Sequence, residues 1–177
     1  MPKIDKEFLL VGTVAGTHGL RGDLKVRPLA GLCPLSADKM VLLRVADREP
    51  EAHIPARVAS HKGGYLLRLQ GLEHIDSVQR LIGAEVLMRR QDVPEPEPDE
   101  FYWGEVQGFV VRDVSLGELG TLDDTFSTAA HDIFVVNGSY GEVLIPVVEA
   151  FLVEVDRVQK CIVVDLPEGL VQKSDAL

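Results

Sequence analysis

The sequence predicts an all-β protein with two small six-stranded β-barrels joined by a proline-rich linker. Its apolar residues occur in short bursts separated by Gly, Pro and Asp, a pattern that favours strands over helices. Midway along the chain, proline alternates with acidic residues over Asp92–Asp99, which favours an extended spacer without regular hydrogen bonding. The strand pattern then begins again. A chain of 177 residues is long enough for one or two domains.

Residues 6–92 are expected to form the first barrel. Apolar residues at helical spacing, followed by Gly83, predict a single short helix over Ile75–Ile82. Six strands with one helix contain too much sheet for βαβ units and are typical of a closed barrel. The expected strands are Phe8–Ala15, Gly22–Pro28, Lys39–Ala46, Ile54–Ser60, Tyr65–Gln70 and Glu85–Arg89.

Residues 93–99 are the expected linker, and residues 100–172 are expected to form the second barrel. A hairpin loop is predicted over Asn137–Gly141. The tail Gln172–Leu177 is expected to fray. The expected strands of this half are Gly108–Asp113, Leu119–Phe126, Asp132–Val136, Glu142–Ile145, Phe151–Asp156 and Cys161–Leu166.

The two halves carry opposite charge. Residues 1–93 contain 14 Lys and Arg against 11 Asp and Glu, a net charge of +3, and the remaining residues contain 4 against 17, a net charge of −13. This asymmetry indicates two different partners. A mildly basic half can meet an anion such as nucleic acid, whereas a strongly acidic half attracts something cationic.

Several classes of protein are disfavoured. No apolar run approaches the ~20 residues of a membrane span, and the first residues lack a secretion signal. Cys33 and Cys161 lie one in each half, so two reduced thiols in a cytoplasmic protein are expected, with an inter-half disulfide as the alternative. The glycine-rich segment Gly16–Gly22 precedes a strand pattern rather than the helix that a phosphate-binding turn requires. The five histidines lack metal-ligand spacing. No catalytic residue, metal or cofactor is therefore predicted.

One face of the first barrel is expected to bind RNA. Strand alternation places four charged residues in a row beside the glycine-rich loop, with Leu24 and Val26 on the opposite face. With few aromatics in this half, we expect recognition of RNA shape through phosphates rather than base stacking. An ordinary solvated barrel face is the alternative. The row consists of Arg21, Asp23, Lys25 and Arg27, and further basic residues are Lys62, Arg89 and Arg90.

The second half opens with three aromatic residues, Phe101, Tyr102 and Trp103. On a strand, Tyr102 would lie opposite the other two. We therefore expect Phe101 and Trp103 to cap the barrel core and Tyr102 to be an exposed anchor at a protein interface. The surrounding acidic residues would suit a basic protein partner. These residues are Glu100, Glu105, Asp123, Asp124 and Asp132.

Three motifs carry a resemblance to a known family. The segment Val11–Val26 resembles the opening signature of the bacterial ribosome maturation factor RimM family. The aromatic triplet, Val143–Pro146 and Val164–Leu170 resemble the second half of that family, a PRC-barrel. The resemblance implies a non-catalytic, cytoplasmic assembly factor that binds the immature 30S subunit near its head and assists 16S rRNA folding and processing. It also implies that the second half engages ribosomal protein nineteen of the small subunit, a basic protein.

The resemblance and the charge pattern together assign expected sites. The residues expected to bind rRNA are His18, Arg21, Lys25 and Arg27. Those expected to bind the ribosomal protein are Phe101, Tyr102 and Trp103, although Phe101 stands where the family usually has tyrosine. We expect a monomer without membrane association. The alternative function is a flavin-type or translation-type barrel enzyme with an accessory PRC module, and a third option is a membrane-associated PRC scaffold.

Overall fold

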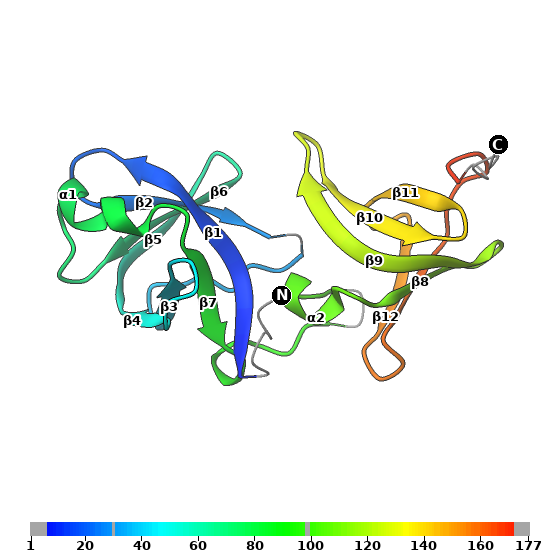
Figure 1. Cartoon of the computed structure of the whole chain (residues 1–177), viewed down its shortest axis with the longest axis horizontal. Helices are drawn as coiled ribbons and strands as arrows, with labels where there is room; N and C mark the ends of the chain where they lie inside the picture. The colour runs from blue at the N-terminus through cyan, green and yellow to red at the C-terminus, as the bar shows by residue number, and fades with distance from the viewer. Residues whose placement is uncertain (1–6, 30, 98–99, 172–177) are drawn as a thin grey trace. The chain divides into compact units, whose positions relative to one another are not determined.

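The computed structural model describes residues 7–29, 31–97 and 100–171. The start of the first expected barrel at Lys6, the linker residues Pro98 and Asp99, and the tail Gln172–Leu177 lie outside these ranges. The chain divides into two compact units between Glu95 and Pro96. The first unit is built on one antiparallel sheet and the second on one mixed sheet (Figure 1). The all-β prediction is confirmed.

The described part of the first unit holds a seven-stranded sheet in the order β4-β3-β7-β1-β2-β6-β5. The predicted helix is present as one α-helical turn, α1 (Ile75–Val78), continued by a 3-10 turn over Gln79–Leu81. Gly83 follows with φ of +86°, a conformation that favours glycine. The strands are β1 (Phe8–His18), β2 (Asp23–Pro28), β3 (Val41–Arg44), β4 (Glu51–His53), β5 (Pro55–His61), β6 (Gly64–Leu69) and β7 (Glu85–Arg89).

The first sheet curls round on itself. Its two edge strands, β4 and β5, are consecutive in the chain and are separated by Ile54 alone. Because such a short connection spans only about 7 Å, the sheet has to bend so that the end of β4 lies close to the start of β5. The interior contains Leu24, Leu67 and Val86, all fully buried. The expectation of six strands was wrong in this unit, because β4 is too short and polar to show a strand pattern.

The described part of the second unit contains a six-stranded sheet in the order β11-β10-β9-β8-β13-β12. All neighbours are antiparallel except β8 and β13, which pair in parallel with Val110 opposite Cys161. The predicted hairpin loop is a tight turn, since Gly138 pairs directly with Gly141. The strands are β8 (Val110–Asp113), β9 (Gly117–Ser127), β10 (Asp132–Gly138), β11 (Gly141–Pro146), β12 (Leu152–Asp156) and β13 (Cys161–Val164).

A second helix was not predicted. The chain turns into α2 (Trp103–Val106) directly after Tyr102. Its four residues are too few to show a helical period in the sequence. Within the described ranges, no helix combines the length and apolar character that a membrane crossing requires.

Candidate functional site

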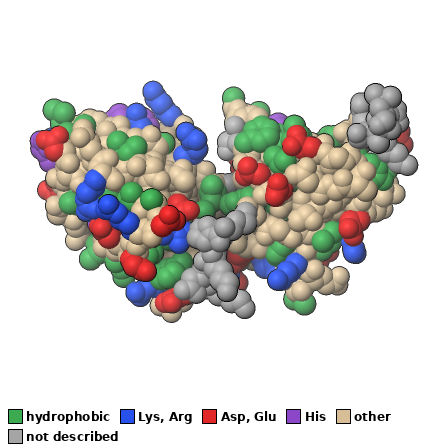
Figure 2. Space-filling view, in the orientation of Figure 1, with side chains coloured by type: hydrophobic (Ala, Val, Ile, Leu, Met, Phe, Trp, Pro, Cys, Tyr) green, Lys and Arg blue, Asp and Glu red, His purple; other side chains and the backbone are tan. Residues whose placement is uncertain are grey.

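A cationic groove lies where two hairpins of the first unit meet. It has a volume of about 460 Å³. The strand β2 supplies Lys25 and Arg27, the end of β1 supplies His18, and the β5–β6 hairpin contributes basic residues beside them. Lys, Arg and His side chains gather at this end of the unit (Figure 2). We define the cationic groove by His18, Lys25, Arg27, His61, Lys62 and Tyr65.

The alternation of β2 explains how its cations reach the groove. Leu24 and Val26 are buried in the barrel, so Lys25 and Arg27 point to solvent, as predicted. The β5–β6 turn brings Lys62 alongside, because Lys62 and Gly63 adopt positive φ values of 46° and 77°. His61 pairs with Gly64 across this turn. Residues far apart in the sequence therefore form one basic surface.

Two histidines meet at the edge of the groove. The rings of His18 and His61 have centroids 5.0 Å apart and are tilted by 56°. Desolvation lowers the pKa of His61, and electrostatic interactions with the nearby His18, Lys62 and Lys25 lower it further. Several cations with no neutralising acid among the lining residues create a positive potential. This arrangement suits an anion such as a backbone phosphate.

Arg21 does not join this groove, which corrects the predicted row. The strand β2 begins only at Asp23, so Arg21 lies in the preceding turn and lines a separate hollow of about 560 Å³ with Arg57, Arg68 and Glu73. Asp23 is also not a free surface charge. Its side chain is 8% exposed, and the carboxylate accepts two hydrogen bonds from Arg68.

The two basic regions share one face of the sheet. Arg57 and Arg68 are Cα partners on β5 and β6, and His18 and Asp23 are partners on β1 and β2. Side chains of directly opposed residues project from the same side of a sheet. We call this outer side of β1, β2, β6 and β5 the basic face. The basic face carries His18, Lys25, Arg27 and His61 of the groove, and Arg57 and Arg68 of the hollow.

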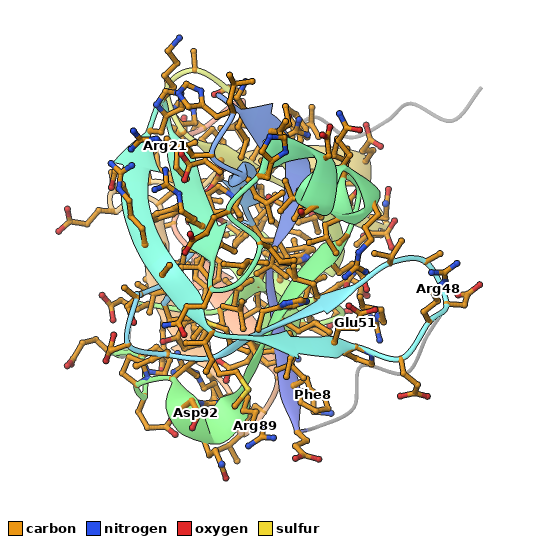
Figure 3. All side chains as sticks on the ribbon, turned by 90° about the vertical axis from the view of Figure 1, so that its left-hand side faces the viewer. Phe8, Arg21, Arg48, Glu51, Arg89 and Asp92 are labelled. Atoms are coloured by element: carbon orange, nitrogen blue, oxygen red, sulfur yellow. The ribbon has the colours of Figure 1, made fainter. Side chains whose placement is uncertain are left out.

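Arg89 and Arg90 lie elsewhere. Figure 3 shows Arg21 at one end of the unit, and Phe8, Arg89 and Asp92 at the opposite end. Arg90 forms an ion pair with Glu95 at 3.0 Å. These two arginines therefore add nothing to the basic face.

Sequence reasoning missed His61, Tyr65, Arg57 and Arg68. A signal was present in His61-Lys62-Gly63-Gly64, because a Lys-Gly-Gly sequence between two apolar strands is typical of a tight hairpin. That hairpin places β5 beside β6. The pairing of β6 with β2, however, is a contact between distant segments, and no local pattern indicates it.

The aromatic triplet is buried. Phe101, Tyr102 and Trp103 are 3%, 1% and 5% exposed. The interpretation of Phe101 and Trp103 as core residues agrees with the structure, but the expectation of an exposed Tyr102 was wrong. The chain enters α2 at Trp103 instead of continuing as a strand, so strand alternation does not apply. The rings of Phe101 and Trp103 lie 5.4 and 6.4 Å from that of Phe134.

The acids expected around Tyr102 lie in different places. Glu105 is on α2 and lies 3.7 Å from the guanidinium Nε of Arg157. Asp123 and Asp124 are exposed on β9. Across the described residues, no three His, Cys, Asp or Glu side chains form a group that could hold a metal ion.

Comparison with known families identifies both halves of the chain. Residues 9–93 match the RimM N-terminal domain, and residues 103–170 match the RimM PRC barrel domain. The chain belongs to the RimM family. The RimM match of the first half favours this assignment over the flavin-type or translation-type barrel of the alternative hypothesis.

Individual RimM proteins align with nearly the whole chain. The ribosome maturation factor RimM of Syntrophotalea carbinolica is 45% identical over 169 residues, which cover 95% of this chain and 97% of that protein. RimM of Pelobacter propionicus is 37% identical over 172 residues, with coverage of 94% and 98%. The crystal structure of a putative 16S ribosomal RNA processing protein RimM from Pseudomonas aeruginosa is 24% identical, with a TM-score of 0.45 and coverage of 91% and 98%.

Proposed function

We propose that this RimM-family protein is a non-catalytic assembly factor of the small ribosomal subunit. In this proposal the first unit binds 16S rRNA through its basic face, and the acidic second unit contacts ribosomal protein nineteen. The protein acts as a monomer in the cytoplasm, binds the immature 30S subunit near its head, and assists folding and processing of the rRNA. Family membership supports the ribosomal context.

The cationic groove is the observation that carries the RNA contact. Lys25, Arg27 and Lys62 converge there without an acidic residue among the lining side chains. The groove is lined mainly by basic and polar side chains, unlike the enclosed, mostly apolar cavities that bind small molecules, and it offers positive charges to an extended anion. Phosphate contacts of this kind supply affinity and orientation without reading base sequence.

Charge reversal tests this assignment. Lys25→Glu and Arg27→Glu should each weaken binding of the full chain to immature small subunits. Each should also make the plot of log affinity against log salt concentration shallower, by about 0.7 to 0.9 for every phosphate that the variant no longer neutralises. Arg48→Glu is the matched control, because Arg48 is exposed on the β3–β4 turn, away from Arg21 (Figure 3).

Equal losses for all three variants would indicate a general effect of net charge rather than binding in the groove. Unchanged affinity and salt slope for Lys25→Glu and Arg27→Glu would refute the RNA contact. Circular dichroism of each variant confirms that the fold is retained.

A further inference from the structure

The outer side of the sheet β9–β10–β11 in the second unit is unusually apolar. Side chains alternate along β10, so Phe134 and Val136 point into the core, whereas Ile133 and Val135 point outward. Ile133 pairs with Phe126 on β9 and Pro146 on β11. Hydrophobic side chains thus extend across all three strands.

Two of these side chains are strongly exposed. Phe126 and Leu144 are each 46% accessible to solvent. Leu144 pairs with Val135, so its side chain lies on the same side of the sheet as that of Ile133. Between them, Val135 is partly exposed and Ile133 is 8% exposed. Neighbouring exposed apolar side chains on one side of a sheet can mark an interaction site. We define the outer apolar patch by Phe126, Ile133, Val135, Leu144 and Pro146.

Acidic side chains border the patch. Asp124 pairs with Val135, and Glu142 pairs with Asn137 further along the same strands. Asp123 occupies a bulge in β9 and accepts a hydrogen bond from the Asn137 amide at 3.2 Å. The three strands contain no Lys or Arg. Hydrophobic and acidic side chains lie next to each other on this unit (Figure 2).

The buried aromatic triplet supports this patch from the inner side of the sheet. Phe134, which contacts Phe101 and Trp103, lies between the two patch residues Ile133 and Val135 in β10. The position of β10 therefore depends on aromatic packing beneath it. The triplet, expected from the sequence to bind the ribosomal protein, is therefore buried, and two of its rings pack beneath the patch.

We propose that the outer face of β9, β10 and β11 is the surface on which the second unit docks a basic protein. An apolar side chain of the partner covers the outer apolar patch, and Lys or Arg side chains around it meet Asp123, Asp124 and Glu142. An apolar centre with a polar rim is the usual anatomy of a protein interface, and the acidic rim selects for a cationic partner. The inference rests on the proposed function, which names ribosomal protein nineteen as that partner.

The test is binding of purified ribosomal protein nineteen of the small subunit to the full chain, followed by fluorescence anisotropy. Leu144→Ser and Phe126→Ser should each weaken binding about tenfold or more, as expected for central interface residues. Asp124→Lys should weaken binding by slowing association, and this loss should shrink at high salt. Val158→Ser is the matched control, because Val158 is 94% exposed on the β12–β13 turn of the same unit.

The outcomes separate this inference from the proposed function. Weaker binding by the two patch variants and by Asp124→Lys, with unchanged binding by Val158→Ser and similar circular dichroism spectra throughout, supports the docking surface. Normal binding by the patch variants overturns the surface and leaves the partner intact. Absence of binding by the unmodified chain overturns the partner and the surface together.

Discussion

Arg68 and Asp23 form a two-pronged ion pair across β6 and β2. The guanidinium donates from Nε to Oδ1 at 2.9 Å and from Nη2 to Oδ2 at 2.7 Å. The hydrogen bonds that Arg68 donates to Asp23, together with the charge of that carboxylate, raise the pKa of Arg68. The pair neutralises the positive charge of Arg68, so the remaining positive charges of the adjacent hollow come from Arg21 and Arg57.

Removal of one partner should destabilise the first unit. Arg68→Met leaves the buried Asp23 side chain, which is 8% exposed, without its charged partner, and the urea midpoint should fall. The double variant Asp23→Leu, Arg68→Met should recover most of this loss, because apolar groups can replace both members of a buried pair at little cost. A double variant less stable than Arg68→Met would show that the pair is not the source of the effect.

RNA binding should strengthen as pH falls. Desolvation and the neighbouring basic groups lower the pKa of His61 in the free protein, which disfavours its protonated ring there. A phosphate in the groove favours the protonated ring, and binding takes up a proton. Affinity should therefore rise from pH 7.5 toward pH 6, by at most about tenfold per pH unit for each proton taken up.

The histidine pair can be tested by substitution. His18→Gln combined with His61→Gln should flatten this pH dependence in binding titrations with immature small subunits. His131→Gln serves as the control, because His131 belongs to the second unit. A pH dependence that survives the double substitution would assign the proton to another group.

Gly22 should be much less tolerant of alanine than Gly19. Both have positive φ, +71° and +62°. A Cβ at Gly22 would collide with the carbonyl oxygen of Leu72 and approach the backbone of His74, whereas nothing lies within 4 Å of one at Gly19. Gly19→Ala should cost about 1 kcal/mol of unfolding free energy, and Gly22→Ala about 3 kcal/mol. Equal costs in urea denaturation would contradict the close packing of this turn.

The supporting role of Phe101 can be measured with a double-mutant cycle. Phe101→Leu should lower the unfolding free energy by about 1 kcal/mol and also weaken binding of ribosomal protein nineteen. Its effect on binding should be coupled to that of Leu144→Ser by at least about 0.5 kcal/mol. With Val158→Ser the two effects should add. Additivity in both cycles would leave Phe101 with a role in stability alone.

Local patterns in the sequence predicted much of the fold. Alternation predicted the outward direction of Lys25 and Arg27, and glycine positions predicted the end of the helical segment at Leu81 and the β10–β11 turn. The short elements β4 and α2 were missed because three or four residues carry no period. Missing α2 mattered most at Tyr102, which was expected to be exposed on a strand but is buried directly before this helix.

The site was predicted less completely, because it depends on pairing between distant segments. His18 and His61 come together through the β1–β2–β6–β5 order, which no short motif specifies. The outer apolar patch likewise needs the register of three strands. The sequence does not show that Phe126 and Leu144 lie on the same side of the sheet. This follows only from their pairing with Ile133 and Val135 on the strand between them.

The parallel pairing of β8 with β13 determines how far folding of the second unit can proceed during synthesis. The first strand of this sheet has to wait for its last, since Val110–Asp113 finds one of its neighbours only when Cys161–Val164 has been made. A nascent chain that ends before Cys161 leaves that edge of β8 open. The sheet of this unit can therefore be completed only late in synthesis. A truncation that removes β13 should destabilise the whole unit, although it removes few residues.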